Sequence, residues 1–162
     1  MAEPLNQHQL SIAAVFAARG IPLTRQRRAV WEHFSTAGRA CTTAEAAEAM
    51  QSQGIGQATV YRTVALLADL GLLMRLHVGG DVPRYAAPPV GHNHPLICGV
   101  CYRIVDFDGE GDLIYLEKQL EATTRFAIYG HVLEIYGICP ECRAARENEL
   151  PGDTPPATLA GG

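Results

Sequence analysis

Four cysteines in two closely spaced pairs restrict the fold of this chain more than any other feature. The pairs are Cys98-Gly-Val-Cys101 and Cys139-Pro-Glu-Cys142. Two residues between cysteines allow a tight turn to direct both sulfurs at one ion. Two such turns supply the closed shell of four thiolates that is typical of a structural zinc site. Because the shell leaves no coordination position open, it predicts a metal that holds a fold together and does not catalyse a reaction.

The segment between the pairs contains 37 residues, more than a simple zinc ribbon needs. It has room for a strand at Arg103 to Phe107, a helix around Asp112 to Thr123 and a strand at Phe126 to Tyr136. Two disulfides or a thioredoxin-type redox motif are the alternatives. We expect a reducing cytosol because no signal peptide opens the chain, and no βαβ pattern surrounds either pair. Both observations favour zinc.

Charge is distributed unevenly along the 162 residues, whose net charge is −4. Residues 1–86 contain eight arginines and six acidic residues, a net charge of +2, whereas residues 87–162 contain five basic and eleven acidic residues, a net charge of −6. This asymmetry predicts that the N-terminal half is the part that meets nucleic-acid phosphates. No apolar run approaches 18 residues, so no membrane span is expected.

The N-terminal half has the pattern of four helices and a hairpin. The first expected helix runs from Leu5 to Arg19, and the second has Thr24 as its N-cap. The third begins at the capping box Thr42-Thr43-Ala44-Glu45, and the fourth runs from Gln57 to Leu70 with Gly71 as its C-cap. Two strands follow, at Leu72 to Val78 and Arg84-Tyr85, and the turn Gly79-Gly80-Asp81 joins them. If the first helix is an extension, this order is that of a winged helix-turn-helix domain. The last helix of such a domain normally enters the major groove.

The fourth helix separates an apolar stripe from a polar face. Val60, Val64 and Leu67 recur at helical spacing and form the expected core stripe. The opposite face, with Thr59, Tyr61 and Arg62, is a candidate DNA-binding surface, and Arg25 and Arg27 at the start of the second helix are candidate phosphate contacts. A solvated helix face is the alternative interpretation.

The predicted fold class is therefore α+β, with a winged helix-turn-helix domain followed by a small α/β dimerisation domain stapled by four-cysteine zinc. We expect the DNA-binding domain at 1–85, a hinge at 86–91, the zinc-containing domain at 92–147 and a disordered Pro/Gly-rich tail at 148–162. The second domain is too short for an ample core, which zinc and pairing with a second copy would both offset.

Five motifs in this order resemble the ferric uptake regulator superfamily of bacterial metal-responsive repressors, over roughly residues 10–145. They are Leu23-Thr24-Arg25-Gln26-Arg27, Ala58-Thr59-Val60-Tyr61-Arg62-Thr63, Leu96-Ile97-Cys98-Gly99-Val100-Cys101, Ile104-Val105-Asp106-Phe107, and the run from His131 to Cys142. The resemblance implies a homodimer that binds a palindromic operator when a second, regulatory metal is present. It also implies that the four-cysteine zinc is structural.

The regulatory site implied by the resemblance is only partly matched. His92-Asn93-His94 supplies a histidine pair, Asp106 matches an acid in the strand, and His77 resembles a wing histidine of zinc-sensing members. Cys41 stands where an imidazole is expected, Ala86 replaces an acid after the wing, and Pro95 lengthens the spacing to Cys98. In an extended segment His92 and His94 point the same way, so a metal bound there would fix the angle between domains.

Two further residues are less favoured as ligands. His131 matches a histidine of a second family site, but the glutamate of that site aligns near Leu113-Ile114 here. His131 is therefore interpreted as a core histidine on one strand face with Leu133 and Ile135. Cys41 is a buried small hydrophobic residue, a ligand or a redox thiol.

Together with these patterns, the resemblance implies a cytoplasmic, metal-dependent repressor of metal-homeostasis or oxidative-stress genes that binds structural Zn²⁺ and a regulatory Zn²⁺ or Fe²⁺. Metal at the hinge would shift the dimer from splayed to closed, with recognition helices about one helical turn apart. A peroxide sensor is the alternative within the family, and a thiol-disulfide protein is the alternative outside it. No enzyme is expected, because no nucleophile accompanies a base and an orienting acid.

Overall fold

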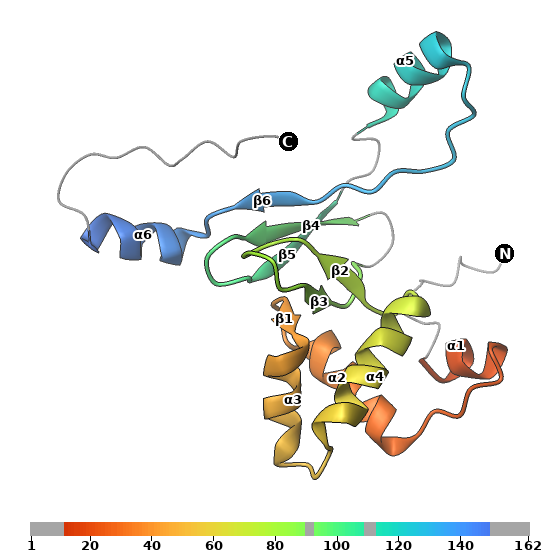
Figure 1. Ribbon diagram of the computed structural model, residues 1–162. Coiled ribbons are helices and arrows are strands. Elements are labelled where there is room, and N and C mark those ends of the chain that lie inside the picture. The colour runs from red at the N-terminus through yellow and green to blue at the C-terminus, as the bar shows by residue number, and fades with distance from the viewer. Residues whose placement is uncertain (1–11, 90–92, 109–112, 150–162) are drawn as a thin grey trace, which may run out of the picture.

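The computed structural model describes residues 12–89, 93–108 and 113–149. These ranges contain an N-terminal helical unit with a small sheet, and a C-terminal unit built on a second sheet (Figure 1). The N-terminal elements are α1 (Ile12–Ala18), α2 (Arg25–Thr36), β1 (Cys41–Thr42), α3 (Thr43–Gln51), α4 (Gln57–Asp69), β2 (Met74–Leu76) and β3 (Arg84–Ala86). The strands pair antiparallel in the order β1-β3-β2, so β2 and β3 form the predicted wing.

Local capping signals set the helix boundaries, as predicted. The Thr24 hydroxyl accepts a hydrogen bond from the Arg27 N–H and starts α2. At the start of α3, the Thr42 hydroxyl accepts from the Glu45 N–H at 3.1 Å, and the Glu45 carboxylate accepts from the Thr42 N–H at 2.6 Å. Gly71, with a φ of +71°, follows the C-cap of α4 and lets the chain turn into the wing.

The core of the N-terminal unit confirms the predicted stripe of α4. Val60, Val64 and Leu67 are buried and pack in one cluster with Phe16 of α1 and Phe34 of α2. This packing holds α4 against the other helices and leaves its opposite face at the surface.

The C-terminal unit contains a three-stranded sheet in the order β5-β4-β6 and two helices. Its elements are β4 (Asn93–Cys98), β5 (Ile104–Asp108), α5 (Ile114–Thr124), β6 (Ile135–Gly137) and α6 (Pro140–Glu149). β4 pairs antiparallel with β5 and parallel with β6. α5 stands clear of both sheets and contains no buried residue (Figure 1).

Several predicted boundaries differ from the observed ones. The strand predicted over 126–136 is wrong for most of its length, because only Ile135–Gly137 pairs with β4. The described part of the first helix begins at Ile12, and residues 5–11 of the prediction lie outside the described residues. The expected hinge begins at Ala86, which is the buried last residue of β3, and residues 90 and 91 lie outside the described ranges. α6 continues to Glu149, and the rest of the predicted tail is not described.

A second apolar cluster joins the two units. Leu76 and Val78 of the wing pack with Ile97 of β4, and partly buried Tyr102 and Ile104 lie against them. The wing sheet is thus in direct contact with the C-terminal sheet. Within the described ranges, no helix is both long enough and apolar enough to span a membrane.

Candidate metal centre and nucleic-acid interface

The two cysteine pairs meet at one end of the C-terminal sheet. Cys98 ends β4 and Cys142 lies in the first turns of α6. The parallel pairing of β4 with β6 brings these ends together, and the Gly99 N–H donates to the Gly137 carbonyl at 2.8 Å. The sulfurs of Cys98, Cys101, Cys139 and Cys142 all lie within 4.8 Å of one another. Four sulfurs at this separation can share one ion.

The pKa values of two of these thiols are shifted in opposite directions. Burial raises the pKa of Cys98, but hydrogen bonds from the N–H groups of Cys139, Cys101 and Val100 outweigh it and lower this pKa to about 6. The hydrogen bond with Cys139, followed by burial, raises the pKa of Cys142 to about 12. Four thiolates so close together repel one another unless a cation is present. The donor set therefore fits a structural Zn²⁺, which binds deprotonated sulfur in a closed shell.

The residues predicted for the regulatory metal do not form one cluster. His94 and Asp106 lie on opposite faces of the sheet, because Phe107 pairs with His94 and Asp106 pairs with Pro95. His77 is exposed just after β2. His92 lies outside the described residues. Among the residues that the structure describes, only the four cysteines form a group of three or more possible ligands within 4.8 Å.

His94 instead contacts His131 and, through it, an acid of α5. The two Nε2 atoms are 3.2 Å apart, and the His131 Nδ1 atom lies 2.8 Å from the Glu117 carboxylate. His94 is buried, whereas the His131 side chain is 15% exposed and belongs to neither apolar cluster. The strand predicted for His131 is wrong, because the residue lies before β6, and its largely buried ring contacts His94 and Glu117.

Glu117 was missed by sequence reasoning. The expected glutamate position fell at Leu113-Ile114, about one helical turn earlier. The usable signal was that Glu117 is the acidic residue of the first turn of α5. α5 begins at Ile114, two residues after the predicted start, and presents the Glu117 carboxylate to His131.

Cys41 occupies the first apolar core. It is 5% exposed, lies opposite Tyr85 in the sheet, and its sulfur is 3.7 Å from the Arg39 carbonyl. Burial raises the pKa of its thiol, which favours the protonated form. These features favour the interpretation of Cys41 as a small core residue.

The predicted DNA-binding residues lie on the surfaces of α2 and α4. Tyr61 is 44% exposed, Arg62 and Arg25 are exposed, and Thr59 is half-buried. Arg27 differs from these, because its guanidinium donates to the Pro22 carbonyl and lies 6.0 Å from the centre of the Phe16 ring. Arg27 thus holds the start of α2 against α1, while the other four side chains are available to a ligand.

The sequence matches the ferric uptake regulator family over residues 18–136. It is 32% identical over 141 residues to the peroxide-responsive repressor PerR of Staphylococcus aureus strain Mu50, a match that covers 85% of this chain and 93% of the relative.

Solved structures share the fold. The ferric uptake regulator of Vibrio cholerae superposes with a TM-score of 0.62 at 23% identity, covering 80% of this chain and all of the other. The iron-containing regulator of Francisella tularensis gives a TM-score of 0.61 at 24% identity, covering 76% of this chain and 96% of the other. These matches confirm the predicted fold class. Because the family model matches most of the sequence, the chain belongs to the ferric uptake regulator family.

Proposed function

We propose that this protein is a dimeric, cytoplasmic repressor whose DNA binding is controlled by a metal held by His94 of the C-terminal sheet and His131 of the segment between α5 and β6. Metal-dependent repression of metal-homeostasis or peroxide-stress genes is the activity of its family, whose members are transcriptional regulators and not enzymes. The observation that carries the proposal is the contact of His94, His131 and Glu117. His94 and His131, 37 residues apart, meet through their Nε2 atoms, and Glu117 of α5 contacts the other ring nitrogen of His131.

The chemistry of these groups suits a regulatory Zn²⁺ or Fe²⁺. Imidazole nitrogens bind both metals, and a carboxylate on the other ring nitrogen of a histidine ligand fixes the tautomer and orientation of that ring. We assign His94 and His131 to this site as ligands, with Glu117 orienting His131 through its other ring nitrogen, and retain His92, one residue before β4, as a further ligand. His77 and Asp106 remain candidates for a separate site at the predicted hinge.

A second copy of the chain would cover the apolar surface of α5 and the segment after it. Tyr115, Phe126, Tyr129 and Val132 are 76% to 104% exposed, and Ile114, Leu116 and Leu120 on α5 are also exposed. Large exposed apolar surfaces mark interaction sites. A homodimer buries the same patch on both subunits and supplies the second recognition helix that a palindromic operator requires.

The DNA-binding face is assigned to α4 and the start of α2. Tyr61 and Arg62 are placed to reach bases or phosphates, and Arg25 is placed to reach a phosphate. Thr59 lies on the same helix closer to the core, and we keep Arg27 as a residue that positions α2. We retain the boundaries 1–85, 86–91, 92–147 and 148–162 as a proposal.

Peroxide sensing is the second candidate function. Its support is the name of the Staphylococcus aureus relative and Asp106 in the motif Ile104-Val105-Asp106-Phe107. Ala86 and Cys41 count against it, since both are buried apolar residues where the family pattern has ligands. A thiol-disulfide protein is disfavoured because four sulfurs share one cluster.

The test is a titration of DNA binding by the zinc-loaded protein with zinc, iron and manganese in parallel. The probe is a duplex selected by the protein from a random-sequence library in the presence of each metal. We expect His94→Ala and His131→Ala to abolish the metal-dependent gain in affinity. His77→Ala and Asp106→Ala are the matched variants, and they should keep this gain. If only His77→Ala and Asp106→Ala lose it, the regulatory site is the hinge and not the cluster with Glu117.

A further inference from the structure

Tyr102, the residue after the second zinc ligand, has an unusual backbone conformation. Its φ is +63°, a left-handed value that a bulky side chain rarely adopts. This conformation closes the turn of the first cysteine pair, because the Tyr102 N–H donates to the Cys98 carbonyl at 3.0 Å. Glycine would fit the turn without strain, so the tyrosine requires a reason beyond the turn itself.

The ring of Tyr102 lies on the winged-helix unit. The guanidinium carbon of Arg84 is 3.5 Å from its centre, close enough for a cation–π contact. Arg84 is only 12% exposed, and its Nη1 atom donates to Glu45 at 2.9 Å. The ring also packs against the wing turn, where a Cβ atom added at Gly79 would lie 2.5 Å from the Tyr102 hydroxyl.

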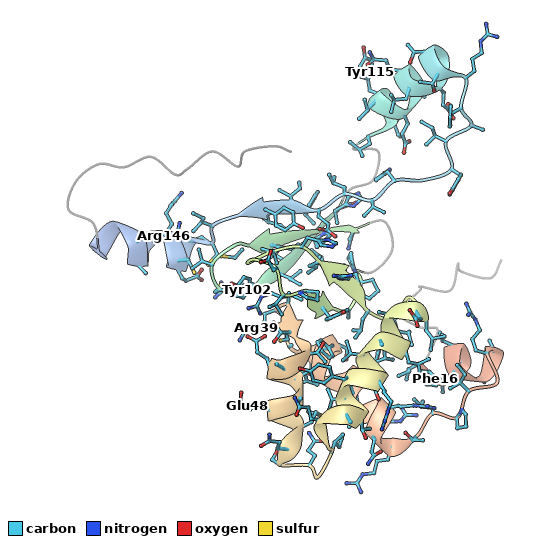
Figure 2. The ribbon with its side chains drawn as sticks, in the orientation of Figure 1. Phe16, Arg39, Glu48, Tyr102, Tyr115 and Arg146 are labelled. Atoms are coloured by element: carbon cyan, nitrogen blue, oxygen red, sulfur yellow. The ribbon has the colours of Figure 1, made fainter. Side chains whose placement is uncertain are left out.

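The backbone around Tyr102 contacts the N-terminal unit as well. The Tyr102 carbonyl accepts from the Ala40 N–H at 2.9 Å, and the Ile104 N–H donates to the Gly38 carbonyl at 3.0 Å. Arg39 and Arg103 form a β-bridge between these two bonds. Tyr102 and Arg39 lie together at the junction of the units (Figure 2). The turn of the first cysteine pair is therefore attached to both the wing and the segment that precedes α3.

We propose that Tyr102 is a positioning residue that latches the zinc-binding turn onto the winged-helix unit and so sets the position of α4 relative to the zinc-containing sheet. Through Arg84 the ring is linked to Glu45, which caps α3, and α3 packs against α4 in the first core. The four-cysteine site would then orient the DNA-binding unit in addition to holding its own sheet. The importance of this latch for DNA binding rests on the proposed function.

The test measures the distance between Glu48 on α3 and Arg146 on α6, which are exposed and lie in different units (Figure 2). Spin labels are attached through ketone-bearing residues at these positions, so that no cysteine is modified, in dimers with one labelled subunit. Tyr102→Gly removes the ring and suits the left-handed backbone, and we expect a broader distance distribution with unchanged zinc content. Tyr102→Phe keeps the ring and should restore the narrow distribution.

A matched glycine pair tests the latch from the wing. Gly79→Ala and Gly80→Ala both place a side chain at positive φ, but only the first meets Tyr102, and nothing lies within 4 Å of the second. We expect Gly79→Ala to broaden the distribution and Gly80→Ala to leave it narrow. On the selected duplex, Tyr102→Gly should bind about 2-fold to 30-fold more weakly than Tyr102→Phe, the range that a cation–π contact spans.

Three results would overturn the proposed role of Tyr102. The first is a distance distribution for Tyr102→Gly as narrow as that of wild type, and the second is loss of zinc from this variant. The third is equal broadening of the distance distribution by Gly79→Ala and Gly80→Ala. Equal or tighter duplex binding by Tyr102→Gly would overturn its role in DNA binding. The distance measurement uses neither DNA nor a regulatory metal. It therefore tests the position of the two units even if the protein proves not to be a metal-dependent repressor.

Discussion

Replacing Glu45 with alanine removes three interactions of one carboxylate, the weakest of which joins its Oε1 atom to the exposed Arg39 guanidinium at 3.4 Å. The Glu45 Oε2 atom accepts from the Thr42 N–H at 2.6 Å and from Arg84 at 2.9 Å. A lost cap costs about 1 kcal/mol. The charged hydrogen bond to Arg84 adds about 1–2 kcal/mol once the 40% exposure of the Glu45 side chain is considered. We therefore expect the free energy of unfolding to fall by about 2–3 kcal/mol, which corresponds to a Tm lower by about 4–12 °C.

Thermal unfolding followed by circular dichroism measures this loss, and two variants divide it. Glu48→Ala is the control, because Glu48 is exposed on the same helix. Glu45→Gln keeps an acceptor for the Thr42 N–H but loses the charge, so it should fall between wild type and Glu45→Ala. If Glu45→Ala lowers the Tm no more than Glu48→Ala, the carboxylate does not support the start of α3.

The same carboxylate predicts a pH dependence with a definite sign. Burial raises the pKa of Glu45, but the hydrogen bonds with Thr42 and the charges of Arg84 and Arg39 outweigh it, so the folded-state pKa lies below 4.5. A depressed pKa means that the stabilisation is present above pH 4.5 and is lost as the pH falls through the folded-state value. The Tm difference between wild type and Glu45→Gln should therefore shrink on acidification. A difference that grows below pH 4.5 would refute the assignment.

Three other perturbations test the remaining parts of the structure. Cys142→Ser should lose zinc and unfold the C-terminal unit, because structural zinc contributes about 10–16 kcal/mol of binding free energy coupled to folding. Metal analysis would detect the loss of zinc, and near-ultraviolet circular dichroism would detect the unfolding. A variant that keeps its zinc and its Tm argues against a structural role of the zinc. Tyr61→Ala and Arg62→Ala should each weaken binding to the selected duplex by at least tenfold in a gel-shift titration, with dimerisation and zinc content unchanged. The reason is that a specific arginine contact provides about 1–3 kcal/mol of discrimination. If both variants bind with wild-type affinity, α4 is not the DNA-binding helix. Thr24→Ala should lower the stability by about 1 kcal/mol in urea unfolding by loss of the α2 cap, and an unchanged midpoint would contradict it.

The N-terminal unit was predictable because its signals are local. Thr24, the pair Thr42 and Glu45, and Gly71 each fix a helix boundary through contacts within a few residues. Val60 and its neighbours at helical spacing then identify the buried side of α4. The four-cysteine cluster was predictable for a similar reason, since each pair forms one turn and the shared ion joins the two.

The C-terminal unit was less predictable because its pairing is non-local. β6 is only three residues long and is defined by its parallel register with Leu96 to Cys98 of β4, which periodicity cannot reveal. The contact of His131 with Glu117 was missed because the family pattern placed the glutamate at Leu113-Ile114, about one helical turn before Glu117. The apolar residues of the wing gave no sign that Leu76 and Ile97 would share a core.

The parallel pairing of β4 with β6 has a consequence for synthesis. Cys139, whose N–H lies 3.4 Å from the Cys98 sulfur, follows it by 41 residues. At about 5–20 residues per second, the ribosome adds this residue about 2–8 s after the first pair. All members of the first core, which lie between Ile12 and Tyr85, are synthesised before then. The last two zinc ligands are thus synthesised only after every residue of the first core, so the four-thiolate shell cannot be complete before the N-terminal unit has all the residues that it needs to fold.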